Sequence, residues 1–338
     1  MTNPLADRME PEAPAPEPWA TRLIDDLDEA ARLLRDGGVV AFPTETVYGL
    51  GARFDDPAAI RHVFAAKHRP ADNPLIVHLS DVDQLPIVAR HVPTSALELL
   101  HAFAPGPLTV VVPRGAAVDS LVTAGHDTVA VRIPAEPTAR ALIRAVGAPL
   151  VAPSANRSGR PSPTRWEDVW EDLAGRIDGV LRGRISELGL ESTVVDCSVD
   201  PPIVLRLGAL PLEELQRVQP AIRLAGAMDL AAGRSPGLRH RHYSPRAKVI
   251  PVEAFEALPA TDASGMCLVL SPPADPHWST RFADVRVFSG ADEYARGLYA
   301  AFREADARGL LRVYCVMPPA DGVGRAIRDR LARASESG

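Results

Sequence analysis

The sequence predicts an α/β fold in two domains, each with helices packed on a sheet. Its 338 residues exceed the roughly 100 to 200 residues of one typical domain. Short apolar runs alternate along the chain with segments that repeat apolar residues at helical spacing. Residues 225–246 mix glycine, arginine, histidine and proline, and they interrupt this alternation as a linker between domains would.

The first domain is expected to span residues 20–220, after a flexible N-terminal tail. Residues 1–19 contain five prolines and few apolar side chains, which is too little apolar surface to offset the entropy of ordering. Apolar spacing over 27–34 predicts a helix that Gly37-Gly38 would end, and the apolar run 39–42 predicts a buried strand.

The same alternation continues to residue 218. Asp56-Pro57 is typical of a helix N-cap followed by proline at the first helical position, and that helix should run to about Lys67. Further helices are predicted near 95–103, 137–146, 164–175 and 212–218. Further strands are predicted at 74–79, 108–112, 129–133, 150–153, 192–197 and 203–207.

The linker should lead into a small C-terminal α/β domain at 247–338. Four apolar runs predict its strands at 248–251, 266–270, 285–288 and 311–316. Helical spacing recurs at 291–307 and 323–334. A unit of about 90 residues is on the scale at which a domain folds alone.

Composition excludes several classes of protein. No apolar run approaches the ~20 residues that span a bilayer and no signal peptide is apparent, so we expect a cytoplasmic protein with no membrane association. Cys197, Cys267 and Cys315 lie far apart, which predicts buried thiols and argues against disulfides or zinc. A net charge of −6 and a pI near 5.9 argue against a broad nucleic-acid surface but allow a local basic pocket.

The common nucleotide-binding signatures are missing. The sequence contains no G-x-x-x-x-G-K-[ST] motif and no complete G-x-G-x-x-G motif, although Gly49-Leu50-Gly51 is a fragment of one. A P-loop ATPase or a nicotinamide-dependent enzyme is therefore disfavoured, and any ATP site must be built differently.

Two polar segments are candidates for a ligand site. Residues 43–51 (PTETVYGLG) are rich in hydroxyls directly after a buried strand, where open α/β sheets place ligands, although an ordinary loop would also explain them. Lys67-His68-Arg69-Pro70 follows a helix. If the chain is extended there, Lys67 and Arg69 point the same way and form a cationic fork for phosphate oxygens; a solvated charge pair is the alternative.

A third candidate segment is 152–159 (APSANRSG), followed by Ser162-Pro163-Thr164 as a helix N-cap region. Its small polar residues would let backbone N–H groups approach an anion, although a plain loop with capping serines is also consistent. Arg132 and Arg206 each lie inside an apolar strand. Because buried charges are rarely left unpaired, each should meet an anion or a carboxylate.

Together and in this order, these segments resemble the YrdC-like catalytic domain of the threonylcarbamoyl-AMP synthase family. The fuller pattern includes 105–109 (PGPLT), 191–196 (ESTVVD) and 235–245 (SPGLRHRHYSP). The last of these is typical of the long, two-domain form. The resemblance is very specific up to Gly208, specific again across the linker, and weak beyond Arg246.

The resemblance implies a fold and an activity. The fold would be a twisted mixed sheet with flanking helices around a positively charged cavity, followed by a smaller Rossmann-like domain. The activity would be condensation of L-threonine, bicarbonate and ATP to threonylcarbamoyl-AMP and pyrophosphate, with Mg²⁺ accompanying the nucleotide. The product would pass to a downstream tRNA threonylcarbamoyltransferase complex that modifies the adenosine next to the anticodon; direct tRNA binding stays open.

The resemblance also implies roles for residues. The threonine-binding set would be Thr46, His78, Arg132 and Ser192. The ATP-binding set would be Arg69, Asn73, Thr128, Ser154, Asn156, Ser162 and Arg206, with His242 or Tyr243 from the linker. Lys67 and Arg69 would be catalytic, Lys67 being shared with bicarbonate, and no carboxylate cluster marks a protein-bound metal.

Two other functions are consistent with parts of this sequence. A double-stranded RNA-binding protein would use the same basic cavity without chemistry, which the acidic pI disfavours. A carbamoyl-transfer maturation factor would use a related domain on carbamoyl phosphate, and the cysteine count excludes the zinc finger expected of it.

Overall fold

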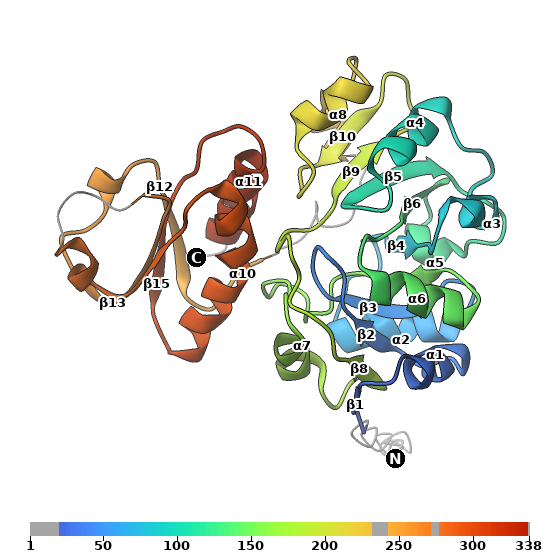
Figure 1. Cartoon of the computed structure of the whole chain (residues 1–338), viewed down its shortest axis with the longest axis horizontal. Coiled ribbons are helices and arrows are strands. Elements are labelled where there is room, and N and C mark those ends of the chain that lie inside the picture. Colours follow the sequence, from blue (N-terminus) through green and yellow to red (C-terminus); the bar gives the residue numbers. More distant parts are fainter. Residues whose placement is uncertain (1–19, 232–242, 272–276, 337–338) are drawn as a thin grey trace, which may run out of the picture.

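The computed structural model describes residues 20–231, 243–271 and 277–336, and it shows two α/β units side by side (Figure 1). One is built on an eleven-stranded sheet and the other on a four-stranded sheet. The predicted fold class is therefore confirmed. The tail at 1–19, which was expected to be flexible, lies outside the described residues.

The larger sheet is mixed, with strand order β1-β8-β2-β3-β7-β4-β6-β5-β9-β10-β11. All seven strands predicted for this unit are present, five of them with shorter bounds. The strands are β1 (Arg22–Ile24), β2 (Val40–Phe42), β3 (Gly49–Arg53), β4 (Ile76–His78), β5 (Leu108–Pro113), β6 (Thr128–Arg132), β7 (Leu150–Val151), β8 (Gly179–Leu181), β9 (Thr193–Asp196), β10 (Ile203–Arg206) and β11 (Arg223–Leu224).

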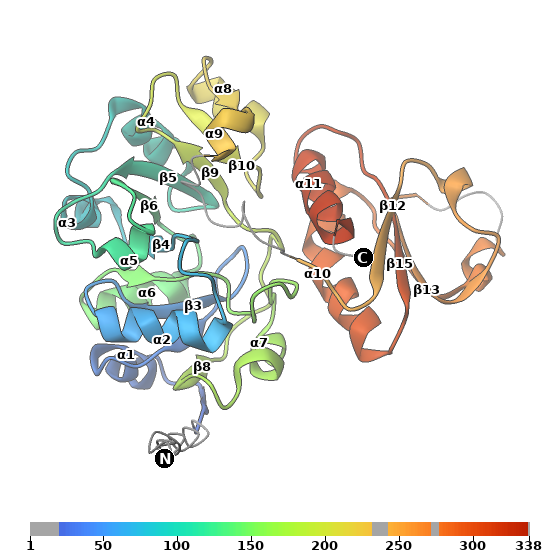
Figure 2. The ribbon, with the colours of Figure 1, turned by 180° about the vertical axis from the view of Figure 1, so that it is seen from behind.

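Helices cover both faces of this sheet (Figure 2). They are α1 (Leu27–Arg35), α2 (Pro57–Lys67), α3 (Leu85–Val88), α4 (Thr94–Phe103), α5 (Ser120–Thr123), α6 (Pro137–Val146), α7 (Trp166–Leu173), α8 (Leu212–Val218) and α9 (Ala227–Ala231), with a 3₁₀ turn at Val82–Gln84. Helices α1 and α6 enclose one apolar cluster, and α2, α4 and α7 border the larger one.

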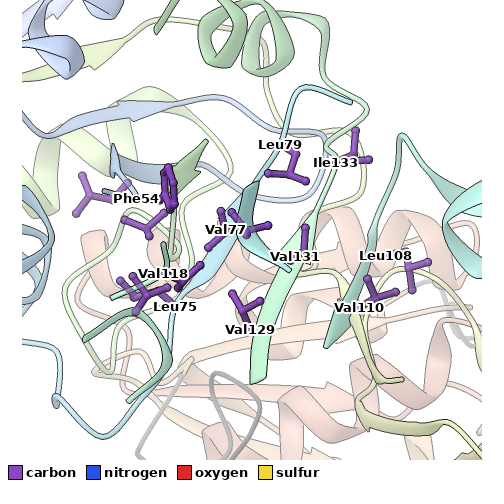
Figure 3. Close-up of a cluster of buried hydrophobic side chains, with 14 of the residues drawn as sticks. Phe54, Leu75, Val77, Leu79, Leu108, Val110, Val118, Val129, Val131 and Ile133 are labelled. Carbon is purple, nitrogen blue, oxygen red and sulfur yellow. The ribbon is translucent and has the colours of Figure 1, made fainter. Parts of the chain in front are cut away.

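The largest apolar cluster of the larger unit includes side chains of the neighbouring strands β4, β6 and β5. Val77 of β4 and Val131 of β6 are both fully buried and face the same cluster, to which Val110 of β5 also belongs (Figure 3). β4 and β6 are parallel neighbours whose register pairs His78 with Arg132. The packed strands therefore bring two polar side chains to one place at their ends.

Strand β3 is not among the strands predicted from the sequence. It pairs antiparallel with β2, so that Gly51 lies opposite Val40. A Cβ added at Gly51 would lie 2.8 Å from the ring of Phe42, which is closer than packed atoms approach. These glycines therefore allow a buried aromatic ring to pack against a strand; they do not mark a turn.

The smaller sheet is fully parallel, with order β12-β15-β13-β14. Its elements are β12 (Lys248–Val252), β13 (Asp262–Val269), β14 (Phe282–Val287), β15 (Arg312–Val316), α10 (Ala291–Ala307) and α11 (Gly324–Ser335), with 3₁₀ turns at Phe255–Ala257 and Trp278–Arg281. Both helices lie on the side of this sheet that faces the larger unit (Figures 1 and 2). All four predicted strands and both predicted helices are present.

The three cysteines are free and buried, as predicted. Burial raises the pKa of Cys197 and of Cys267 to about 12, so both remain thiols at neutral pH. Within the described ranges, no helix has both the length and the apolar character needed to cross a membrane.

Candidate active site

The larger unit contains a cavity at the ends of β4 and β6, closed in part by Tyr243. The cavity has a volume of about 60 Å³. Its walls come from the β2–β3 loop, the α2–β4 loop, β4, β6, the loop after β7, the residues just before β9, and β10. Of the predicted site residues, those that line it are Thr46, Arg69, His78, Arg132, Ser154, Asn156, Ser162, Ser192, Arg206 and Tyr243.

Arg132, at the end of β6, is buried beside a carboxylate. Its Nη1 donates to Thr46 Oγ1 at 2.8 Å, and its Nη2 lies 2.7 Å from Glu45 Oε1. The prediction that this strand arginine meets a carboxylate is confirmed. Within the described residues Nη2 has no acceptor at hydrogen-bonding angles, so this donor is available to a further anion at the cavity wall.

His78 is the strand neighbour of Arg132 and is also buried. Burial, together with the charge of Arg132, lowers the pKa of His78 to about 3. The imidazole is therefore neutral at physiological pH. Its Nδ1 lies 3.4 Å from the Ile76 carbonyl oxygen, so Nε2 is the ring nitrogen left for a ligand. The neutral ring adds no charge to the cavity.

Two pairs of hydroxyls stand near this arginine. Thr44 Oγ1 and Thr46 Oγ1 are 2.9 Å apart, and Thr109 Oγ1 and Ser192 Oγ are 2.7 Å apart. All four side chains are buried. The arrangement suits a small ligand that carries its own hydroxyl beside a carboxylate, because buried hydroxyls pair with polar partners.

Arg69 and Arg206 form a second, cationic part of the cavity wall. Arg69 donates to the carbonyls of Asn73 at 3.1 Å and Pro74 at 2.7 Å, and Arg206 donates to Ser192 Oγ at 3.2 Å. Burial, with the charge of Arg206, lowers the pKa of Arg69 to about 10, so it stays protonated at neutral pH. Two arginines in one wall suit the oxygens of a phosphate chain.

The predicted fork of Lys67 and Arg69 is wrong in its geometry. Lys67 ends α2, and His68 adopts a left-handed conformation with φ of 51°, so the alternation of an extended chain does not apply. Lys67 Nζ donates to the carbonyls of Ser154 and Asn156 and does not line the cavity. Burial and the charge of Arg69 hold the pKa of Lys67 well below its ordinary value.

The loop after β7 is fastened by its own side chains. Ser154 Oγ donates to Asn156 Oδ1 at 2.6 Å, and Asn156 Nδ2 donates to the carbonyls of Arg157 and Arg160 at 2.9 Å each. Ser162 Oγ donates to the Glu191 carboxylate at 2.6 Å. Ser154, Asn156 and Ser162 thus reach the cavity on a rigid support.

Tyr243 closes the cavity from the side of the smaller unit. Its backbone has φ of 66°, its side chain is buried, and its ring stacks on Tyr299 with centroids 5.6 Å apart. The next residue, Ser244, donates its N–H to the Gly159 carbonyl at 2.9 Å. His242, the other linker candidate, lies outside the described residues.

Comparisons with known proteins match both units of this architecture. A family model described as "Telomere recombination" matches residues 32–208, and the model of the threonylcarbamoyl-AMP synthase C-terminal domain matches residues 210–336. The threonylcarbamoyl-AMP synthase of Pyrococcus abyssi is 40% identical over 335 residues, covering 94% of this chain and 95% of the relative. The chain belongs to the threonylcarbamoyl-AMP synthase family.

Further relatives agree with this membership. The synthase of Bacillus subtilis is 38% identical, covering 94% of this chain and 97% of the relative. The structure of P. abyssi Sua5 complexed with L-threonine matches with a TM-score of 0.82 at 37% identity, covering 94% of this chain and 96% of that one. The resemblance stated from the motifs is confirmed.

Two of the ATP-binding candidates, Thr128 and Asn73, do not line the cavity. Thr128 is at the start of β6, on the face that Ala130 and Arg132 share because strand side chains alternate. Asn73 is buried, and its carbonyl accepts from Arg69.

Residues that the sequence reasoning did not assign complete the site of this synthase family member. Glu45 and Glu191 line or border the cavity, and both lie inside motifs that were quoted without a role for the acid. Arg330 reaches Glu191 from α11. The signal for Arg330 was its position on the apolar face of α11, three residues after Ile327 and four before Ala334.

The described residues contain no group of three or more His, Cys, Asp or Glu side chains that could hold a metal ion. Glu191, the acid that lines the cavity, is engaged by Ser162, Tyr299 and Arg330. These residues do not form a protein cage for Mg²⁺, which binds six oxygens in octahedral geometry.

Proposed function

We propose that this chain is an L-threonylcarbamoyladenylate synthase that condenses L-threonine, bicarbonate and ATP to threonylcarbamoyl-AMP and pyrophosphate. The observation that carries the proposal is the division of one cavity into two parts. Arg132 with the threonine and serine hydroxyls forms one part, and Arg69 with Arg206 forms the other. Ser192 joins them, because it bonds to Arg206 and contacts Thr109.

The first part suits threonine. The guanidinium of Arg132 would bind the substrate carboxylate, while neutral His78 and the hydroxyls of Thr46 and Ser192 would surround the substrate hydroxyl. The structure of P. abyssi Sua5 complexed with L-threonine supports this choice of ligand. Arg132 already faces Glu45, so the substrate carboxylate would share the guanidinium with that acid.

The second part suits the phosphates of ATP. Threonine's amine would attack the carbon of bicarbonate, releasing water and giving a carbamate. A carbamate oxygen would then attack the α-phosphorus, and the bond to the β-phosphate oxygen would break as pyrophosphate leaves. Arg69 and Arg206 would stabilise the charge that spreads over the phosphoryl oxygens, which is the main requirement of such a transfer.

The remaining predicted residues have supporting places in this scheme. Ser154, Asn156 and Ser162 would contact the nucleotide from the loop after β7, and Thr128 would contact it further along β6. Lys67 would act as a positioning residue, because its ammonium holds the carbonyls of Ser154 and Asn156. Mg²⁺ is proposed as the counter-ion of the phosphates, and no step here depends on it.

Water exclusion is a further requirement, since a free carbamate decomposes in water. Tyr243 is placed to exclude water because it lines the cavity while its ring packs into the smaller unit. We propose that residues 225–246 act as a lid whose described end is Tyr243. The two sheets, with the predicted boundaries 20–220 and 247–338, would be the two domains that it joins.

The product's destination is part of the proposal. Threonylcarbamoyl-AMP would pass to a tRNA threonylcarbamoyltransferase complex in the cytoplasm, for modification of the adenosine next to the anticodon. A primary role in binding double-stranded RNA is disfavoured, because Arg132 and Arg206 are only 4% and 7% exposed and do not reach a duplex backbone.

The test is threonine-dependent pyrophosphate release from ATP and bicarbonate by the full-length protein. Release that requires threonine and bicarbonate, with threonylcarbamoyl-AMP identified by mass spectrometry, is the expected result. Pyrophosphate release at the same rate without threonine would overturn the proposal.

A further inference from the structure

Arg330 of α11 is the largest completely buried side chain in the described part of the chain, and it reaches into the larger unit. Its Nε donates to Glu191 Oε2 at 3.0 Å, and its Nη2 donates to the Leu207 carbonyl at 2.8 Å. Asp329 forms a further ion pair with it at 2.5 Å. A guanidinium buried this fully needs such partners, and the first two belong to the catalytic unit.

Glu191 connects Arg330 with the cavity. It lines the cavity and accepts from Ser162 Oγ at 2.6 Å and from the Tyr299 hydroxyl at 3.0 Å. Burial alone would raise the pKa of Glu191, but the charges of Arg330 and Arg206 hold it below its ordinary value, so the group is ionised. An ionised carboxylate can only accept hydrogen bonds, so the Ser162 hydroxyl hydrogen must point toward Glu191. The lone pairs of the Ser162 oxygen then point away from Glu191.

Arg330 also holds the aromatic ring that closes the cavity. Its Cζ lies 4.8 Å from the centroid of the Tyr243 ring, which is within the range of a cation–π contact. Tyr299, from α10, stacks on the same ring. Because a bulky residue rarely adopts positive φ, the conformation of Tyr243 depends on contacts of this kind.

We propose that Arg330 is a positioning residue for the nucleotide part of the cavity, acting through Glu191 on Ser162 and directly on the Tyr243 ring. The inference rests on the proposed function, which assigns Ser162 and Tyr243 to ATP. It gives the smaller unit a part in substrate binding without any contact of its own with the reacting atoms.

Other contacts between the units provide a matched control. Arg325 Nη1 forms an ion pair with Glu213 Oε1 at 2.7 Å, also between α11 and the larger unit. Both side chains are partly exposed, and neither lines the cavity. Arg325→Ala therefore weakens the docking of the smaller unit without touching the Arg330–Glu191–Ser162 connection.

The experiment measures KM for ATP and for threonine separately in the full-length protein and its variants. Arg330→Met should raise KM for ATP about tenfold or more, the scale of an indirect network effect. KM for threonine should change little, since Thr109 and Arg206 hold the Ser192 hydroxyl independently. Arg330→Lys should recover part of the loss, and Arg325→Ala should keep both constants.

Glu191→Gln is the second arm, because it keeps the shape of the side chain and removes the charge that Arg330 binds. It should also raise KM for ATP, and the double variant Arg330→Met with Glu191→Gln should be no worse than the poorer single variant. Fully additive losses, an unchanged KM for ATP, or equal changes in both KM values would overturn the inference.

Failure of the proposed function gives a different result. In that case the parent protein itself shows no threonine-dependent pyrophosphate release. The affinity of the parent and of Arg330→Met for α,β-methylene-ATP can then still be compared by calorimetry. Equal affinities for this probe would reject the positioning role, whatever the reaction.

Discussion

Arg132 Nη2 and Glu45 Oε1 lie 2.7 Å apart, and their side chains are only 5% and 6% exposed. Removing one partner of a buried pair leaves an uncompensated charge, which costs about 3 to 5 kcal/mol of the free energy of unfolding. The pair therefore has a structural role as well as the proposed role in binding threonine.

These two roles can be separated by variants. Arg132→Met should lose both stability and threonine affinity, the latter by roughly 100-fold or more for a buried charged contact. Adding Glu45→Gln should restore most of the free energy of unfolding, because no charge is then buried alone, but should not restore binding. Urea unfolding and calorimetry with threonine measure the two effects. Threonine binding by the double variant at parental affinity would contradict the assignment of Arg132.

His78 predicts a pH dependence of stability. Its pKa is about 3 in the folded chain and near 6.5 when unfolded, so between these values the unfolded state binds more protons. Stability should therefore fall as pH drops below 6.5, by roughly 1.5 kcal/mol on reaching about pH 5. His78→Gln should not show this loss of stability. Urea unfolding of the parent and the variant at the two ends of this pH range therefore isolates the contribution of His78. Parallel losses in the two proteins would show that His78 does not contribute.

Lys67 and Arg69 should differ when each is replaced by alanine. Lys67→Ala removes an almost completely buried ammonium from the two carbonyls that it holds, which should cost about 2 to 4 kcal/mol of stability. Arg69→Ala should cost about 1 kcal/mol or less, because Arg69 is only partly buried and water can replace it at the carbonyls that it leaves. Turnover should nevertheless fall on the order of 100-fold or more in Arg69→Ala, since a charge on the phosphates is lost. Thermal unfolding measures the difference in stability, and pyrophosphate release measures the difference in turnover. Equal stability of the two variants would contradict the structural role given to the buried Lys67.

The Lys67 result shows what sequence reasoning could and could not reach. Helix α2 was predicted from its Asp56 cap and apolar spacing, because these signals are local, and the cap hydrogen bonds to Ala58 and Ala59 are present. The direction of Lys67 depends instead on a loop almost 90 residues later, so no local signal fixes it. Local patterns predicted the elements; long-range contacts decided which cations face the cavity.

The same division explains Glu191 and Arg330. Arg330 is a charged residue on the apolar face of α11, and Glu191 follows the buried Leu190 just before β9. Such positions indicate a buried partner without identifying it. The two meet across 139 residues of sequence. Strand β3 was missed for a related reason. Its glycines are needed because the Phe42 ring packs against them, and the local sequence does not show that contact.

Substrate choice should follow the hydroxyls of the threonine part. Valine has the shape of threonine but would leave the polar groups around Thr46 and Ser192 unpaired, so kcat/KM should fall on the order of 100-fold or more. Serine keeps the hydroxyl and loses one methyl, which should cost roughly 10-fold to 200-fold. Pyrophosphate release with each amino acid at several concentrations gives the ratios. Valine turned over as well as threonine would overturn the assignment of Thr46 and Ser192.

The last prediction concerns the linker and its described end, Tyr243. A spacer of glycine and serine in place of 238–243 should cripple synthesis, although every catalytic-domain residue that lines the cavity is kept. Tyr243→Ala alone should reproduce most of that loss, because this ring both lines the cavity and packs on Tyr299 and Arg330. Tyr243→Phe keeps the ring contacts, so it separates closure of the cavity from any role of the hydroxyl. Threonine-dependent pyrophosphate release at saturating ATP ranks the three variants. A spacer variant as active as the parent would mean that the segment only tethers the two units, whereas an active Tyr243→Ala beside an inactive spacer would move the closing role to residues before Tyr243.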